Sequence, residues 1–284
     1  MTARPRRAAA GRGPAGRRPL EGRRVLVTRA ADQAAEFIAL LDEHGAVAVE
    51  APMIRIAPPE DTVPLDTACR RLPRFDWIVF SSVNAVEALV ARVRHVSGDL
   101  RNLKGPRLCA VGSATAERLT RYGLKVGVVP AEYRAEALAE ALARTRPLRG
   151  VLVLVPRSDI GRDVVARELT AQGAEVTEVV AYRTIAVDPA RDGGPDVRRL
   201  LLDGRLDAVT FTSTSAVENL VRVLGGSGAA VDLLGRVAVA CIGPVTADAA
   251  ARHHVRTDIV PAEYTVPALV AALGDWFARP PDQG

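Results

Sequence analysis

Residues 76–87 read DWIVFSSVNAVE, and residues 207–218, which lie 131 positions further along the chain, read DAVTFTSTSAVE. Each copy contains a short apolar run, then a turn rich in Ser and Thr, then the start of an amphipathic stretch. A short β-branched apolar run is typical of a buried strand, and the amphipathic stretch after it is typical of a helix. The two copies therefore predict two strand–helix units of the kind that build parallel sheets.

The repeat extends over most of the chain. Pairs at the 131-residue offset are Gly112 with Gly243, Thr115 with Thr246, and Tyr133 with Tyr264, and pairs at an offset of 128 are Arg29 with Arg157, and Gly45 with Gly173. We expect each copy to be a five-stranded α/β unit. The expected strands are 25–28, 47–51, 77–81, 107–111 and 126–129, then 151–155, 175–180, 207–212, 237–242 and 257–260.

Turn-rich stretches inside each copy indicate that the chain crosses twice between two sheets. They follow the second expected strand of each copy, at 57–61 and 188–196, whereas the junction between the copies, 144–150, is short. Each copy would then lend its first strand–helix–strand unit to the other domain. Two repeats folded side by side are the alternative. The predicted bounds are a disordered Arg-rich tail at 1–20, a first domain of 21–53 with 187–284, and a second domain of 57–180.

The positive charge of the chain is concentrated in its first residues. The formal net charge is +5, and residues 1–24 alone carry +7, from eight arginines against Glu21, which leaves −2 for the rest. A protein that follows a phosphate backbone needs its basic side chains on the folded body. We therefore expect no nucleic-acid partner.

Composition also limits the setting and the chemistry. No stretch has the ~18 apolar residues of a membrane helix, and the start lacks the apolar core of a signal peptide, so we expect neither membrane contact nor export. Cys69, Cys109 and Cys241 are few and odd in number, which favours a reducing, cytoplasmic compartment. The four histidines do not form a metal motif, and the folded body has no phosphate-binding loop, so we expect neither a metal nor a cofactor.

The ordered motifs of the two copies together resemble the uroporphyrinogen-III synthase family from about residue 22 onward. The stretches that carry this resemblance are VLVTR (25–29), DWIVFSS (76–82), NAV (84–86), AVGSATA (110–116), LVPRS (154–158), GA at 173–174 with YRT (182–184), FTS (211–213) and IGPVTA (242–247). Each stretch alone is a weak signal. Their order and spacing make the resemblance specific.

The resemblance implies two flavodoxin-like α/β domains with parallel sheets and swapped β-α-β units, joined by a two-stranded linker, with the active site in the cleft between them. It implies a cofactor-free lyase that converts hydroxymethylbilane, a linear tetrapyrrole, into uroporphyrinogen III for haem, sirohaem and cobalamin synthesis. The terminal hydroxyl leaves as water, the last pyrrole ring is inverted through a spiro intermediate, and the macrocycle closes. A monomer is expected, with transient contact to the upstream hydroxymethylbilane synthase.

The substrate carries many carboxylates, so the candidate binding residues are donors in turns at the carboxyl ends of expected strands, where ligands of open α/β sheets bind. They are Arg29, Ser82, Gly112, Arg157, Ser158, Ser213 and Gly243, with Thr115 and Thr246 in the helical turns that follow two of the glycines. The serines could instead serve only as helix N-caps. Arg29 and Arg157 could instead form salt bridges between the domains. Arg162 is a weaker candidate of the same kind.

Tyr182 is the candidate catalytic residue because it breaks the symmetry of the repeat. Its counterpart at the 128-residue offset is Ile54, whereas Tyr133 and Tyr264 repeat with their neighbours and are interpreted as structural. Tyr182 also matches the tyrosine that the family places near the cleft. A phenol with a pKa near ~10 is protonated at neutral pH and can assist departure of a hydroxyl group. The alternative is that this tyrosine only packs in the linker.

A rival function from another class is a two-lobed protein that closes on an acidic small molecule without catalysis, because two similar α/β lobes with two crossovers would suit it equally well. A transferase for phosphorylated or nucleotide-sugar substrates is a third alternative. The absence of a phosphate-binding signature disfavours it.

Overall fold

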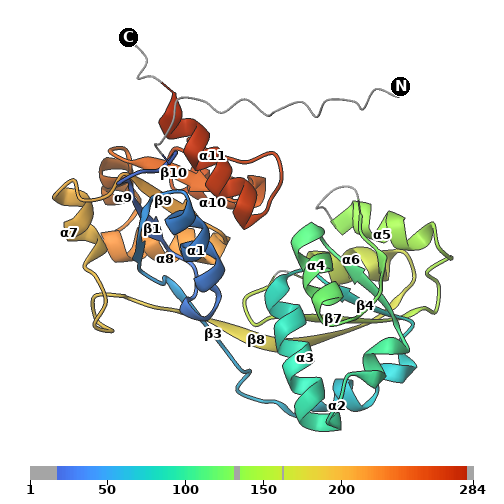
Figure 1. Ribbon diagram of the computed structural model, residues 1–284. Helices are drawn as coiled ribbons and strands as arrows, with labels where there is room; N and C mark the ends of the chain where they lie inside the picture. The colour runs from blue at the N-terminus through green and yellow to red at the C-terminus, as the bar shows by residue number, and fades with distance from the viewer. Residues whose placement is uncertain (1–17, 131–134, 162, 280–284) are drawn as a thin grey trace, which may run out of the picture.

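The computed structural model of the protein describes residues 18–130, 135–161 and 163–279. They form two α/β domains, each built on its own parallel sheet, with strands β3 and β8 running between them (Figure 1). The predicted fold class is therefore confirmed. The predicted N-terminal tail lies almost entirely outside the described residues.

The first sheet has the strand order β10-β9-β1-β2, and all its neighbouring strands are parallel. Its strands are β1 (Arg24–Val27), β2 (Val47–Glu50), β9 (Ala208–Phe211) and β10 (Ala238–Cys241). The fifth strand expected at 257–260 is reduced to a single parallel bridge between Ile259 and Ala240.

Successive residues of the first sheet pack on opposite faces, as period-2 side-chain alternation requires. Leu26, Val209 and Val239 belong to the core on one face, and Val25, Ala208 and Ala240 to the core on the other. The first face is covered by α7 (Val197–Leu202), α8 (Thr214–Leu224), α9 (Ser227–Leu234) and α10 (Pro244–Arg252), and the second by α1 (Ala35–Glu43) and α11 (Val266–Ala278).

The second sheet has the order β3-β8-β7-β4-β5-β6. Its strands are β3 (Ile54–Ala57), β4 (Trp77–Phe80), β5 (Arg107–Ala110), β6 (Val126–Val128), β7 (Leu152–Ser158) and β8 (Glu175–Ala186). One face packs against α2 (Val63–Arg70), α3 (Val83–Ser97) and α4 (Ser113–Arg121), and the other against α5 (Ala135–Ala143) and α6 (Val164–Ala171). Short 3₁₀ turns occur at Ala31–Gln33, Leu72–Arg74 and Arg101–Lys104.

The two copies of the repeat exchange their first β-α-β units, as predicted. The unit β1-α1-β2 from the first copy lies beside β9 and β10, and the unit β7-α6-β8 from the second copy lies beside β4, β5 and β6. Within each domain, the strand order then follows the same flavodoxin-like pattern. We propose that the first domain comprises residues 21–53 and 187–284 and the second residues 57–180.

A two-stranded antiparallel ribbon joins the domains. The register pairs Ile54 with Ala186 and Ala57 with Arg183. Strand β8 therefore runs beyond the 175–180 expected from the sequence, because β3 supplies backbone partners for its last residues. None of the described helices is both long and apolar enough to cross a bilayer.

Candidate active site in the interdomain cleft

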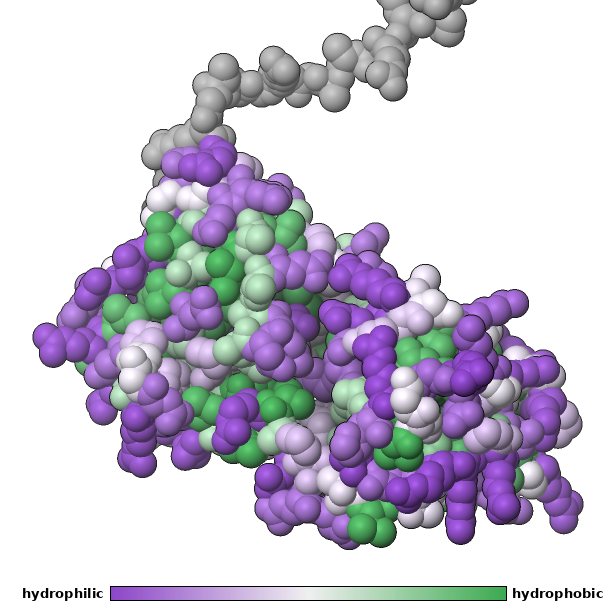
Figure 2. All heavy atoms as spheres, turned by 60° about the horizontal axis from the view of Figure 1, so that its bottom comes forward, coloured by the Kyte–Doolittle hydropathy of each residue, from purple (hydrophilic) through white to green (hydrophobic). Residues whose placement is uncertain are grey.

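A cleft of about 1470 Å³ lies between the domains, and residues of both domains line it. Figure 2 looks onto the groove between the two lobes and shows hydrophilic side chains on both sides of it. The cleft is bordered by the turns that follow β1, β4, β5, β9 and β10. Parallel strands end at one edge of their sheet, and these edges of the two sheets face the cleft, with three turns from the first sheet and two from the second.

The helix N-termini at the cleft are of two kinds. Ser82 and Ser213 are N-caps, and their hydroxyl oxygens accept from the N–H groups of Ala85, at 3.1 Å, and Ala216, at 3.2 Å. Gly112 and Gly243 occupy the same place before α4 and α10 without any side-chain cap. Backbone N–H groups in an uncapped first turn are a ready anion-binding site.

The two glycines disfavour a side chain for different reasons. Gly112 has φ of +97°, a conformation that L side chains rarely adopt. Gly243 is extended, but a Cβ there would lie 3.1 Å from Cγ of Tyr264. Tyr264, which the repeat suggested to be structural, therefore packs on Gly243 and also lines the cleft. Its repeat partner Tyr133 is outside the described residues.

Thr115 and Thr246 lie in the first turns of α4 and α10. Both side chains are buried, and both line the cleft. The repeat thus places one Gly and one Thr on each side of the site. Of the predicted binding residues that the structure describes, all except Arg157 border the cleft.

Tyr182 reaches the cleft from β8. Its ring is buried in the core of the second domain, with 7% of the residue exposed, and its hydroxyl lies 3.1 Å from the Ser82 hydroxyl. Burial raises the pKa of this phenol above its ordinary value of 10, against the opposing influence of hydrogen bonds to Ser82 and Asn84. The phenol therefore keeps its proton throughout the neutral range and can donate a hydrogen bond into the cleft.

Arg29 borders the cleft at the end of β1 and is half-buried. Its Nε is buried without a hydrogen-bond acceptor, and no carboxylate within the described ranges forms an ion pair with it. Burial lowers the pKa of its guanidinium, and the neighbouring Arg118 lowers it further, although Glu36 and Asp32 oppose this. Arg29 therefore has donors available for an anionic ligand.

Arg157, the repeat counterpart of Arg29, does not border the cleft. Its guanidinium donates to the carbonyls of Ser158 at 2.9 Å and Gly161 at 3.2 Å, and its Nε lies 3.0 Å from a carboxylate oxygen of Glu178 in the same domain. It shapes the loop after β7 and forms no salt bridge between domains. Ser158 remains at the cleft, where its hydroxyl contacts Asp159 and Thr184. Arg162 is outside the described residues.

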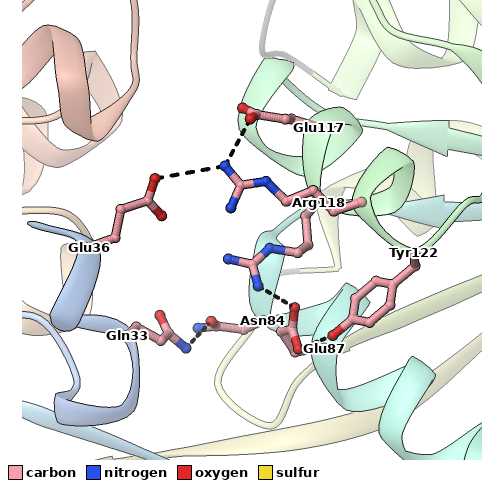
Figure 3. Close-up of polar contacts among 8 residues, drawn as sticks. Gln33, Glu36, Asn84, Glu87, Glu117, Arg118 and Tyr122 are labelled. Carbon is pink, nitrogen blue, oxygen red and sulfur yellow. Dashed lines mark hydrogen bonds and ion pairs between the residues drawn. The ribbon is translucent and has the colours of Figure 1, made fainter.

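Several cleft residues were not anticipated from the sequence (Figure 3). Gln33 donates to Asn84 across the domains at 2.7 Å, and Arg121 lies 3.7 Å from Glu36. Arg118 donates to Glu87 at 2.8 Å, and the Tyr122 hydroxyl donates to the same carboxylate at 2.6 Å. Arg118 could have been found, because it lies three residues after Thr115 and so on the same helix face. The pairing of Gln33 with Asn84 has no signal in the sequence.

The cleft carries both signs of charge and no dominant one. Its basic side chains are Arg29, Arg92, Arg118 and Arg121, and its acidic ones are Asp32, Glu36, Glu87, Glu117, Glu218 and Glu263. Within the part of the chain that the structure describes, no group of three or more His, Cys, Asp or Glu side chains could hold a metal ion.

The swapped domains define a two-domain α/β protein with a large cleft between the domains. The family described as "Uroporphyrinogen-III synthase HemD" matches residues 35–271. The chain belongs to the uroporphyrinogen-III synthase family, as its sequence motifs suggested.

Relatives and solved structures agree with this assignment. A putative uroporphyrinogen-III synthase of Methanothermobacter thermautotrophicus is 37% identical over 88% of this chain and 96% of its own length, and a uroporphyrinogen-III synthase of Synechococcus elongatus is 34% identical over 91% and 97%. The crystal structure of a mutant uroporphyrinogen III synthase from Thermus thermophilus has a TM-score of 0.62 at 20% identity, covering 88% of this chain and 96% of that one. The synthetase from Helicobacter pylori has a TM-score of 0.55 at 14% identity, covering 88% and 97%. These two structures support the fold.

Proposed function

We propose that the interdomain cleft is the active site of a uroporphyrinogen-III synthase, a cyclising hydro-lyase of tetrapyrrole biosynthesis that acts on hydroxymethylbilane. The observation that carries this proposal is the convergence of strand-end donors from both domains around one large cleft that also holds the Tyr182 hydroxyl. Membership of the family supports the reaction, and the donors that line the cleft support assigning it there.

The mixed lining suits a substrate with many carboxylates spread over a long chain. The uncapped first turns of α4 and α10 offer backbone donors from one domain each, and Arg29 offers a guanidinium. Charge-assisted hydrogen bonds to such donors are stronger than neutral ones. Distributed donors fix the conformation of the whole tetrapyrrole, which is the main task when ring inversion has to outcompete direct closure.

Tyr182 assists the first chemical step. The C–O bond to the terminal hydroxyl breaks as the lone pair of the adjacent pyrrole nitrogen moves in, and the phenol donates a hydrogen bond to the departing oxygen. Hydroxide takes up one proton to leave as water, and the pyrrole carbon that closes the macrocycle releases one proton. The overall reaction therefore loses one molecule of water and consumes no net proton. Inversion through the spiro intermediate takes place between these two steps. Since positioning dominates, we expect no single side chain to be indispensable.

Two narrower expectations belong to the same proposal. We propose that the protein works in the cytoplasm as a monomer. We also propose that it meets the upstream hydroxymethylbilane synthase only transiently, since the substrate closes spontaneously if it waits in solution.

The test is to add the purified protein to freshly generated hydroxymethylbilane and to separate the oxidised products by chromatography. An enzyme-dependent excess of isomer III over the spontaneous isomer I supports the proposal. Isomer I alone, from protein with a cooperative unfolding transition, overturns it and favours a two-lobed protein that binds an acidic ligand without catalysis.

A further inference from the structure

Two arginines with unused donors border the cleft from opposite domains. Arg29 follows β1 of the first domain, and its buried Nε has no acceptor. Arg118 lies on α4 of the second domain and donates one terminal nitrogen to Glu87 at 2.8 Å. A guanidinium has five N–H donors, so a single carboxylate contact leaves most of them available. Each domain thus presents one cation to the same space.

Contacts across the cleft join the segments that carry the two arginines. Gln33, four residues after Arg29, donates to Asn84 (Figure 3). Glu36 faces Arg121, which lies one turn after Arg118 on α4. The charge of Arg118 is felt at Arg29, whose pKa it lowers. Two cations held near one another in a partly buried cleft repel each other, and an anion between them removes that repulsion.

Glu87 and Tyr122 orient Arg118. The Glu87 carboxylate receives one hydrogen bond from Arg118 and a second from the Tyr122 hydroxyl, at 2.6 Å. The carboxylate is thereby held by two residues of the second domain, and its ion pair with Arg118 fixes the direction of the guanidinium while leaving its other N–H donors available. An arginine held in this way loses little freedom when it binds a ligand.

The pair occurs only once, although the fold is repeated. At the offsets of the repeat, Arg29 corresponds to Arg157, which is bound to its own loop, and Arg118 corresponds to Ala249, which is fully buried. The pseudo-symmetric position therefore has no such pair. A linear substrate with distinct ends, only one of which is inverted, needs a cleft that distinguishes the ends.

We propose that Arg29 and Arg118 form a bridging receptor for one carboxylate of the substrate, one guanidinium from each domain, so that its binding draws the domains together and sets the direction of the tetrapyrrole in the cleft. This inference rests on the proposed function for the identity of the ligand. A carboxylate can accept hydrogen bonds on both oxygens, so one group can be shared by two arginines.

The test combines ligand affinity with domain closure. The probe is the stable aromatic form of the product, which keeps its carboxylates, and its dissociation constant is measured by fluorescence titration. Small-angle X-ray scattering follows compaction on binding. The variants are R29Q, R118Q, the double variant and R118K. R199Q is the matched control, because Arg199 lies on α7 away from the cleft with 78% of its side chain exposed.

We expect R29Q and R118Q each to weaken binding by about 10-fold or more, the range of a lost charge-assisted hydrogen bond, and to abolish compaction. The double variant should also bind much more weakly than the wild type. Its fold-increase in dissociation constant should nevertheless be much smaller than the product of the two single fold-increases, because the bridge is already lost with either arginine. R118K should recover part of the affinity, and R199Q should match the wild type.

The inference would be overturned if the fold-increases in dissociation constant of R29Q and R118Q multiplied in the double variant. It would also be overturned if R118Q bound the probe as tightly as R199Q. This test can be separated from the test of the main proposal. If the wild-type protein makes isomer III and R118Q binds the probe normally, only the bridging role of the two arginines is refuted. A wild-type protein that makes no isomer III removes the proposed function itself.

Discussion

Replacing Tyr182 with Phe removes one oxygen atom from a buried ring and leaves its packing in place. The lost contacts are the 3.1 Å hydrogen bond to the Ser82 hydroxyl and the hydrogen bond with Asn84. Ser82 keeps its other partner, because its oxygen still accepts from the N–H of Ala85. The free energy of unfolding should therefore fall by only about 1 to 2 kcal/mol, the usual net value of one or two hydrogen bonds.

The effect on catalysis should be larger than the effect on stability. If the phenol donates to the departing hydroxyl, the variant loses a hydrogen bond to a group that gains negative charge, which is worth about 1.5 to 3 kcal/mol. This corresponds to a decrease in kcat of about 10-fold to 150-fold. KM should change little, because the substrate is held mainly by donors elsewhere in the cleft.

The assay is a steady-state measurement with freshly generated hydroxymethylbilane, with quantification of both isomers. Slower turnover should let spontaneous isomer I take a larger share, while the product formed on the enzyme stays isomer III. Since burial raises the pKa of Tyr182 above 10, the wild-type kcat should show no loss from phenol ionisation below that pH. Unchanged kcat in the variant, measured on folded protein, would refute a role for Tyr182.

Further predictions concern capping, burial and domain contact. Ser82→Ala and Ser213→Ala, at equivalent positions of the repeat, should each lower the free energy of unfolding by about 1 kcal/mol in urea titrations, because each removes an N-cap. Only Ser82→Ala should also lower kcat. An equal loss of kcat in both variants would count against a catalytic role for the Ser82–Tyr182 contact. Burial raises the pKa of the Cys109 thiol to about 12 from 9.0. Above pH 9 the folded state therefore keeps a proton that the unfolded state loses. The contribution of this thiol to the free energy of unfolding should be intact below pH 9 and should decline above it by about 1.4 kcal/mol per pH unit. Cys109→Ala should remove this part of the pH dependence. Gln33→Ala should enlarge the radius of gyration of the ligand-free protein without changing the unfolding midpoint, because it removes a contact between the domains and none within a core. An unchanged radius of gyration would show that this hydrogen bond does not hold the two domains together.

The repeat was sufficient to predict the architecture. Apolar strands ending in Ser, Thr or Gly turns predict parallel βα units, and turn-rich breaks after the second strand of each copy predict the exchange between domains. Strand β3 was absent from the strands expected from the local pattern, because Ile54–Ala57 alternates too briefly, and only the family resemblance implied a two-stranded linker. It exists because the end of β8 lies beside it. Pairing between segments more than a hundred residues apart is a tertiary effect that local propensity does not contain.

The cleft residues were predictable only to the extent that strand ends predict them. Arg29 and Arg157 have equivalent places in the repeat, and the Nε of each is buried without a hydrogen bond. They differ because a terminal nitrogen of Arg157 donates to loop carbonyls and its guanidinium pairs with Glu178, whereas Arg29 has no such partners among the described residues. Nothing in the local sequence distinguishes them, because the difference depends on what each side chain meets after folding. Arg118 could have been inferred by continuing the helical face of Thr115 for one more turn.

The exchange of β-α-β units also sets an order of events during synthesis on the ribosome. The second sheet is complete once β8 has emerged, because β3 to β8 form one continuous stretch of chain. The unit β1-α1-β2 emerges earlier, yet β9 follows it only after roughly 160 residues, which at usual translation speeds is about 8 to 30 s. Through that interval the apolar side chains of Val25, Leu26 and Val27 have no sheet to join. An insertion in any loop of the second domain would lengthen this interval without altering a residue of the first domain.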